Sequence, residues 1–189
     1  MKYIIGFLLT IGLLILLIVL LATGGSNTSK VPNTSKKLDS YATTDAVTRL
    51  TIDGPITNPQ EHKATRITVG RDSTTYEQLQ GYDGAVVNTQ SFPNTHTSYL
   101  SFLRAIELAG FTLGDKSANV QNDRGHCPLG NRYIFELENN GKQVERFWSS
   151  GCSGPRSFKG NTNLNISLFK RQVPGFDKLD STFNNSFNL

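Results

Sequence analysis

An uninterrupted apolar segment near the start of the chain, residues 3–22, constrains the fold more than any other feature. Its 20 residues, from 3 to 22, are mostly isoleucine and leucine, and none of them is charged. At a rise of about 1.5 Å per residue, a helix of this length spans about 30 Å, the thickness of the hydrocarbon core of a bilayer. We therefore expect a transmembrane anchor over residues 1–22, with the lipid bilayer as the partner of residues 3–22.

A cleaved secretory signal is the alternative interpretation of this segment. Lys2 precedes the apolar run, and Ala22-Thr23-Gly24 follows it with small residues. The apolar region of a signal peptide is about 7 to 15 residues long, which is shorter than this run. The length therefore favours an anchor that is retained.

The lysines on the two sides of the segment do not decide its orientation. Lys2 lies before it, and Lys30, Lys36 and Lys37 lie after it, so the positive-inside rule favours neither direction. The later lysines begin some distance beyond the segment, and the two cysteines of the chain have the character of a disulfide pair, which forms in oxidising compartments. We expect the C-terminal domain to lie outside the cytoplasm, at the cell membrane.

The segment that follows, residues 23–45, predicts a flexible linker. It consists largely of Ser, Thr, Asn, Gly and Lys and has hardly an apolar side chain, so it cannot bury enough surface to offset its ordering entropy. The chain carries a net charge of +4, but several of its lysines lie before residue 46. In residues 46–189 the one adjacent basic pair is Lys170-Arg171, whereas nucleic-acid binding needs a basic stripe or patch. We expect no nucleic-acid partner.

The patterning of residues 46–189 indicates a single α+β domain. Alternating apolar and polar residues predict strands over 47–52, 62–69 and 74–79, a short strand over 85–87 and a hairpin over 132–149. A three-and-four apolar spacing predicts one helix from Asn94 or Thr95 to Gly110 and a second from Asn163, with Leu164, Leu168 and Phe169 facing the core. We expect an antiparallel sheet of about five strands with two helices on one face, preceded by one transmembrane helix.

The hairpin gives the most detailed expectation. A two-residue Asn140-Gly141 turn places Asn139 opposite Lys142 and, in strict register, Phe135 opposite Arg146. Arg146 then lies across Phe135 on the apolar face, and on the other face Glu136 lies opposite Glu145, with Glu138 diagonal to it. These three glutamates form either a solvated face relieved by Lys142 or a docking surface for a basic partner or a divalent ion.

The two cysteines bracket this hairpin, and we expect them to form a disulfide between Cys127 and Cys152. Extending the pairing brings them to within two residues of direct opposition, an offset that a turn or bulge can absorb. The bond would close a loop of about 25 residues and stabilise the domain by roughly 3 kcal/mol.

A catalytic alternative uses the same cysteine. The order His96, Cys152, Arg156 resembles that of sortase cysteine transpeptidases, and this resemblance implies that Cys152 is a nucleophile, His96 a proton carrier and Arg156 an oxyanion ligand. The residues before Cys152 read Trp148-Ser149-Ser150-Gly151 instead of the Thr-Leu-x-Thr of that family, and Arg156 follows Cys152 very closely.

No cofactor or metal site is expected. His62, His96 and His126 are far apart in the sequence and lack the spacing of zinc ligands on one element. There is no Gly-rich phosphate loop and no Gly-x-Ser-x-Gly elbow. We interpret Asp123-Arg124-Gly125 as a turn and His126 as a loop side chain.

Several motifs together resemble one group of proteins. The anchor and Thr-rich linker are followed by Gly81-Tyr82, by Asn122-Asp123-Arg124-Gly125-His126-Cys127 and by Phe147-Trp148-Ser149-Ser150-Gly151-Cys152. This layout is similar to uncharacterised single-pass proteins of Saccharibacteria-like candidate-phylum bacteria, a group that implies no catalytic residue. We expect a non-enzymatic module that binds a protein or glycan partner at the cell envelope, with a sortase-like transpeptidase as the alternative.

Overall fold

A computed structural model describes residues 37–185, which form an α+β domain. Its strands are β1 (Val47–Asp53), β2 (Lys63–Val69), β3 (Ser73–Gln80), β4 (Ala85–Pro93), β5 (Arg132–Asn139) and β6 (Lys142–Ser150). Its helices are the 3₁₀ turn η1 (Leu38–Tyr41) and the α-helices α2 (His96–Leu108), α3 (Ala118–Gln121), α4 (Thr162–Lys170) and α5 (Phe176–Asn185).

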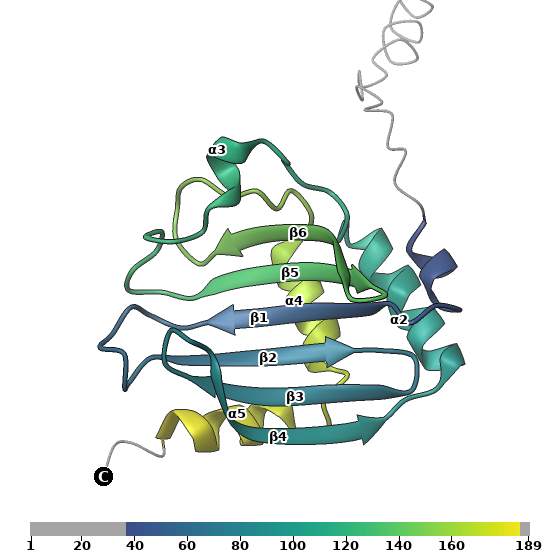
Figure 1. Cartoon of the computed structure of the whole chain (residues 1–189), viewed down its shortest axis with the longest axis horizontal. Coiled ribbons are helices and arrows are strands. Elements are labelled where there is room, and N and C mark those ends of the chain that lie inside the picture. Colours follow the sequence, from purple (N-terminus) through teal and green to yellow (C-terminus); the bar gives the residue numbers. More distant parts are fainter. Residues whose placement is uncertain (1–36, 186–189) are drawn as a thin grey trace, which may run out of the picture. The chain divides into compact units, whose positions relative to one another are not determined.

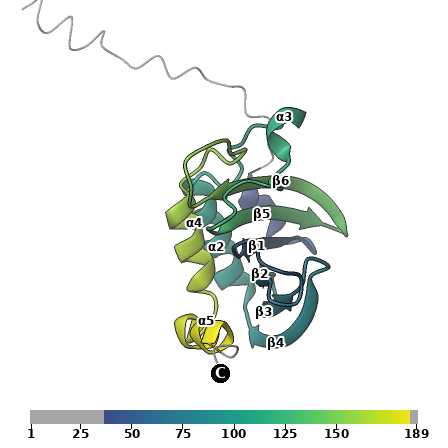
Figure 2. The ribbon, with the colours of Figure 1, turned by 90° about the vertical axis from the view of Figure 1, so that its left-hand side faces the viewer.

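The strands form one antiparallel sheet of six strands in the order β4-β3-β2-β1-β5-β6 (Figure 1). The meander from β1 to β4 extends to one side of β1, and the β5–β6 hairpin pairs with its other side. The predicted α+β class with an antiparallel sheet is confirmed, but the count of about five strands is corrected to six, and the two helices expected on one face are corrected to three, α2, α4 and α5 (Figure 2). The short strand expected at 85–87 is the start of the nine-residue β4.

The two faces of the sheet differ in what covers them. Helices α2, α4 and α5 all lie on one side (Figure 2), where they bury Leu50, Ile67, Tyr76 and Phe135 in the core. We call the opposite side the open face. Because side chains alternate along a strand, the residues next to these core residues in the sequence point to the open face, and many of them are polar. Arg66 on β2, which precedes Ile67, is one of them.

Local signals account for the starts of α2 and α4. Thr95 caps α2 by accepting a hydrogen bond from the Ser98 N–H, as the sequence predicts. Asn161 caps α4 by accepting one from the Leu164 N–H. The prediction that Leu164 faces the core is wrong, because Leu164 is 45% exposed and the neighbouring Asn165 is buried instead, donating from Nδ2 to the Ala109 carbonyl.

The domain begins earlier than residue 46, so the end of the predicted linker is corrected. Leu38, Tyr41 and Ala42 are buried in the core, and Tyr99 of α2 donates a hydrogen bond to the carbonyl of Ala46 over 2.7 Å. A few apolar side chains within a polar segment are enough to fold η1 onto α2. The average composition of residues 23–45 does not reveal these apolar side chains, because most of the segment is polar.

The predicted anchor, residues 1–22, and most of the linker lie outside the described residues. Between residues 37 and 185, the helices are all too short or too polar to cross a membrane.

The hairpin confirms the predicted turn and corrects the predicted register. Asn140 and Gly141 both have positive φ, 51° and 72°, as a two-residue hairpin turn requires. Beyond Glu138 the pairing shifts by one residue, because Val144 is an extra residue in a β-bulge. Phe135 therefore lies opposite Phe147, which shares its core face.

This bulge has a packing cause. In strict register Arg146 would enter the core and Phe147 would face solvent; with the bulge, Phe147 is buried and Arg146 lies on the open face. Glu136 then lies opposite Arg146, and Glu145 lies opposite Leu137. The predictions that Glu136 faces Glu145 and that Arg146 lies across Phe135 are both wrong.

Candidate functional site: a cleft on the open face

The open face carries a cleft of about 500 Å³ at the end of the sheet where β1 and β3 stop. Figure 1 shows that the β1–β2 connection, the β3–β4 turn and the chain leading into β5 all lie at this end. The floor comes from β1, β2, β3 and β5, one wall from the turn at 81–84 and the other from the segment at 123–125. The lining residues are Thr51, Asp53, Ile56, His62, Ala64, Arg66, Leu79, Gly81, Tyr82, Gly84, Asp123, Arg124, Gly125, Arg132 and Ile134.

One wall is held in place by Trp148 and Arg146, which project from β6 on the open face. Trp148 Nε1 donates to the carbonyl of Val120 over 2.7 Å, and Arg146 Nη2 donates to Asp123 Oδ1 over 2.6 Å. The ring of His126 stacks on Trp148 with 4.9 Å between centroids. The segment from α3 to His126 is therefore fixed over β5 and β6, and His126 is a loop side chain whose ring is held against Trp148.

The end of the cleft is closed by a buried network around Asp53. The Asp53 carboxylate accepts from His62 Nε2 over 2.7 Å and from Arg132 Nε over 2.9 Å. The side chains of His62 and Arg132 are only 3% and 5% exposed. His62 Nδ1 also faces the carbonyl of Pro55 at 3.1 Å, so the network ties the β1–β2 connection to the sheet.

Tyr82 is the aromatic residue of the cleft, and three contacts fix it. Its ring stacks on His62 with 4.1 Å between centroids and 16° between planes. Its hydroxyl donates to the Thr57 carbonyl over 2.7 Å and accepts from the Thr57 N–H over 3.1 Å. Tyr82 nevertheless remains 51% exposed, which makes it a rigid aromatic surface at the rim of the cleft.

Two arginines on the cleft have unused hydrogen-bonding capacity. Arg66, from the middle of the floor, approaches Glu77 with 3.6 Å between Nη1 and Oε2. Its Nε is buried and has no hydrogen-bond partner among the described residues, so a ligand can reach this side chain, which is 32% exposed, only at its terminal nitrogens. Arg124 is exposed on the wall, and in the described part of the chain its guanidinium group has no ion-pair partner. The cleft therefore offers hydrogen-bond donors to a ligand.

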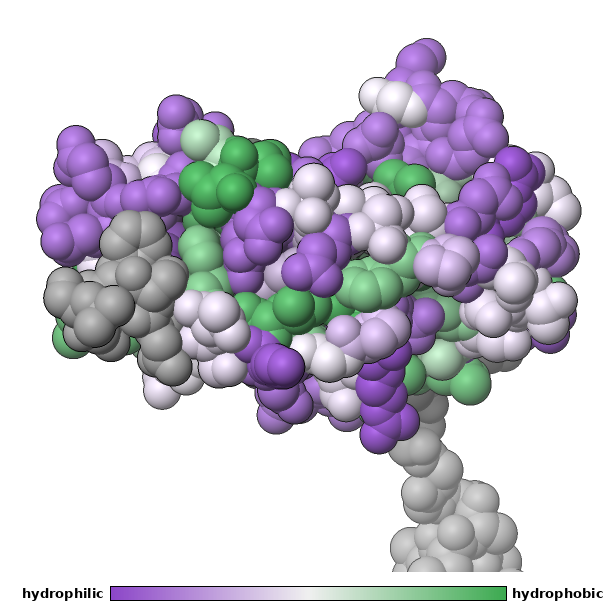
Figure 3. Space-filling view, turned by 90° about the horizontal axis from the view of Figure 1, so that it is seen from below, coloured by the Kyte–Doolittle hydropathy of each residue, from purple (hydrophilic) through white to green (hydrophobic). Residues whose placement is uncertain are grey.

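Other surfaces of the domain are less well prepared for a ligand. A depression of about 650 Å³ lies along α4 and α5, but its rim residues Arg171, in the turn after α4, and Lys178, on α5, are exposed side chains. Figure 3 looks at the side of the molecule that carries β4, where Val86 and Val87 are each 50% exposed. The apolar areas on that side are broken up by polar ones, so they form no continuous apolar patch.

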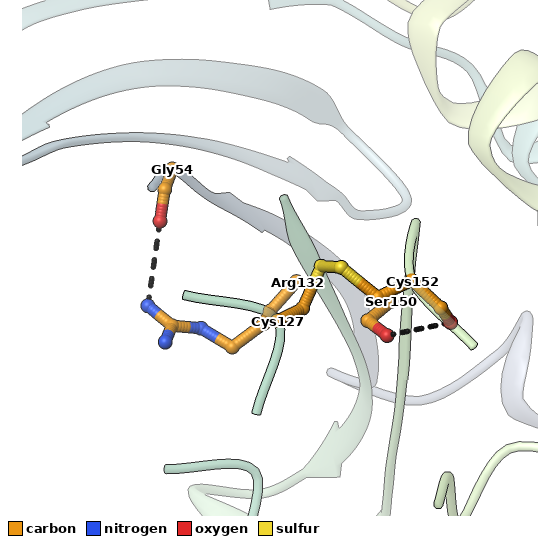
Figure 4. The surroundings of a disulfide bond; sticks show 5 residues. All are labelled: Gly54, Cys127, Arg132, Ser150 and Cys152. Carbon is orange, nitrogen blue, oxygen red and sulfur yellow. Dashed lines mark hydrogen bonds between the residues drawn. A yellow bond between two sulfur atoms is a disulfide. The ribbon is translucent and has the colours of Figure 1, made fainter. Parts of the chain in front are cut away.

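Cys127 and Cys152 form a disulfide with 5.5 Å between their Cα atoms, the pairing that the sequence predicts. Figure 4 shows this bond joining the chain before β5 to the chain after β6, with the Arg132 side chain reaching the carbonyl of Gly54 nearby. A Cβ atom at Gly130 would lie 2.7 Å from Cys127 Sγ, so the loop packs closely against the bond.

The three residues of the catalytic alternative are not brought together. Cys152 follows β6, whose last residue lies at the Asp53 end of the sheet, whereas His96 follows β4, which ends beside Ser73 at the other end. Arg156 lines a separate depression together with Cys152. The sulfur of Cys152 is bonded to Cys127, and a cysteine nucleophile needs a free thiolate.

The three predicted partner-binding glutamates do not form one acidic surface. Glu136 and Glu138 lie on the open face and approach Arg49 at 3.7 Å and 3.4 Å. Glu145 lies on the other face, is 8% exposed and pairs with Lys116 at 2.7 Å. Between residues 37 and 185, the His, Cys, Asp and Glu side chains form no group of three or more that is placed to hold a metal ion.

No known family model and no curated protein sequence matches this chain. The cleft is therefore the feature from which function can be inferred, and the sequence pattern alone does not mark its residues as a site. Tyr82 and Arg124 both lie in segments with clear turn signals, and Arg66 lies in an ordinary strand pattern. The one available signal was an aromatic residue between the turn glycines Gly81 and Gly84.

Proposed function

We propose that this chain is a non-enzymatic binding module of the cell envelope, and that the cleft on its open face binds a glycan. The observation that carries the proposal is Tyr82, an aromatic ring that is half exposed yet fixed by stacking on His62 and by two hydrogen bonds to Thr57. A sugar ring has an apolar face of C–H groups that packs against an aromatic ring. Because Tyr82 is already ordered, binding costs little side-chain entropy.

The surroundings of Tyr82 suit the other part of a sugar, its hydroxyl groups. Thr51 and Arg124 line the same cleft and offer a hydroxyl and a guanidinium group. Ile56 and Leu79 add apolar surface. The volume of about 500 Å³ lies within the range typical of small-molecule sites.

The proposed location is outside the cytoplasm, with residues 3–22 as a membrane anchor. The length and composition of that segment support the anchor. The Cys127–Cys152 disulfide supports an oxidising compartment, since such bonds are rare in the cytosol.

The test is a binding screen with the full chain in mild detergent against an array of envelope oligosaccharides, followed by calorimetric titration of those that bind. Tyr82→Ala should weaken binding at least about tenfold, a loss of about 1.4 kcal/mol. Leu108→Ala, which truncates a side chain that is 90% exposed on α2, is the matched control and should change nothing. Circular dichroism checks that both variants are folded.

Two results would contradict the proposal. The first is the absence of any glycan that binds the wild-type chain. The second is a glycan that binds the folded Tyr82→Ala variant as tightly as wild type.

A further inference from the structure

The balance of hydrogen-bond donors and acceptors in the cleft points to the charge of its ligand. The acidic side chains that line it are already engaged. Asp53 accepts from His62 at 2.7 Å through Oδ1 and from Arg132 at 2.9 Å through Oδ2. Asp123 accepts from Arg146 at 2.6 Å through Oδ1. A ligand in the cleft therefore meets few free acceptors.

Of the three arginines that line the cleft, Arg132 is held by Asp53, and the other two are engaged much less. Arg66 has a side chain that is 32% exposed, and its ion pair with Glu77 is long, at 3.6 Å. Arg124 is exposed, and no described residue forms an ion pair with its guanidinium group. Each guanidinium group carries several N–H donors arranged to hold a carboxylate by two parallel hydrogen bonds.

These two arginines lie on the same cleft as Tyr82 but come from different elements. Arg66 projects from β2 in the floor, where it pairs in register with Thr51 and Glu77 of the neighbouring strands. Arg124 comes from the wall over β5, and Tyr82 comes from the turn on the opposite side. A ligand that extends from the Tyr82 ring across the floor to the other wall of the cleft therefore meets both guanidinium groups.

We propose that the cleft selects acidic glycans, in which sugar rings carry carboxylate groups, over neutral ones. This inference rests on the glycan binding proposed above and adds the chemical class of the glycan. Tyr82 supplies the stacking contact that any sugar ring can make. Arg66 and Arg124 supply paired, charge-assisted hydrogen bonds, which a carboxylate can accept and a neutral sugar cannot.

The test compares an oligogalacturonate with the same oligosaccharide after methyl esterification, which keeps the rings and removes the charge. Both are titrated calorimetrically into the full chain in mild detergent. The acid should bind at least about tenfold more tightly than the ester, a difference of about 1.4 kcal/mol. Raising the salt concentration from about 50 mM to about 300 mM should weaken the binding of the acid and leave the affinity for the ester unchanged, because salt screens exposed charge pairs.

Three arginine variants locate the effect. Arg66→Gln and Arg124→Gln should each reduce the preference for the acid over the ester while the ester still binds. Arg104→Gln is the matched control, since this side chain is 62% exposed on α2, away from the open face. It should leave both affinities as they are in wild type.

The failures of the two proposals are distinguishable. Equal binding of acid and ester, abolished in both cases by Tyr82→Ala, overturns the selection for carboxylates and leaves glycan binding standing. An acid preference that survives both cleft variants, or that Arg104→Gln also removes, overturns the assignment to Arg66 and Arg124. If neither the acid nor the ester binds, the acidic-glycan inference is contradicted. The array of envelope oligosaccharides then tests the proposed glycan binding by itself.

Discussion

Replacing both cysteines by serine should destabilise the domain by an amount that follows from the chain topology. The bond between Cys127 and Cys152 joins residues that are 25 positions apart. In the chain-entropy model, a loop of this length removes enough freedom from the unfolded chain to stabilise the folded state by about 3.5 kcal/mol at 25 °C. Serine is close to cysteine in size, so the double variant changes little else in the fold.

The assay is equilibrium unfolding in urea, followed by circular dichroism and by the fluorescence of Trp148. A domain of this size has a dependence on urea of about 1 to 3 kcal/mol per molar, so the midpoint should fall by about 1 to 3.5 M. Wild-type protein in a strong reductant should unfold at the same midpoint as the double variant. The agreement of these two measurements separates the effect of the bond from that of the serines.

A loss of less than about 1 kcal/mol in the double variant would contradict this stabilisation by the bond, since that value lies well below the loop-closure prediction. So would a wild-type protein, denatured without reductant, in which two thiols react with an alkylating reagent. That result would mean that the bond between Cys127 and Cys152 does not form.

Two further predictions concern buried polar groups. Asp53→Asn leaves the Arg132 side chain, 5% exposed, without its carboxylate partner, and thermal unfolding should show a loss of about 3 kcal/mol; Asp72→Asn, at an exposed ion pair with Arg71, should leave the transition unchanged. Burial raises the pKa of Tyr99, so the folded state disfavours its ionisation; stability should not depend on this group below about pH 10 and should fall as the pH rises further. Tyr99→Phe should reduce stability by about 1 kcal/mol at neutral pH, because the hydrogen bond to Ala46 is lost. The stability of this variant should fall less steeply than that of wild type as the pH is raised in alkaline unfolding experiments. An alkaline dependence that the phenylalanine variant retains in full would contradict the role of this hydroxyl.

Features that depend on a few neighbouring residues could be predicted from the sequence. Thr95 caps α2 because its side chain accepts from an N–H three residues later, and Asn140-Gly141 forms a hairpin turn because both residues tolerate positive φ. The disulfide followed from the same hairpin, since Cys127 and Cys152 bracket it and only their rough spacing was needed.

Features that depend on tertiary packing could not be predicted from the sequence. The bulge at Val144 forms because burying Phe147 in the core stabilises the fold, whereas burying Arg146 there would destabilise it. This difference depends on the opposing strand and on the helices that cover the sheet. Leu38 and Tyr41 fold against α2 although the segment around them is polar. A pattern within one segment carries neither piece of information.

The cleft belongs to this second class. Arg66, Tyr82 and Arg124 lie on β2, on the β3–β4 turn and on the segment after α3, and they meet only because the strand order places all three at one end of the open face. Each residue taken alone has an ordinary structural explanation. Their proximity is what distinguishes them.

A nuclear magnetic resonance titration of the isotopically labelled full-length chain with an oligosaccharide that binds would show whether a glycan occupies the cleft beside Tyr82. We expect the largest shifts at Thr51, Arg66, Tyr82 and Arg124, and no response from α2 and α4, the helices on the opposite face. Shifts centred on those helices, with the cleft residues unchanged, would contradict glycan binding in the cleft.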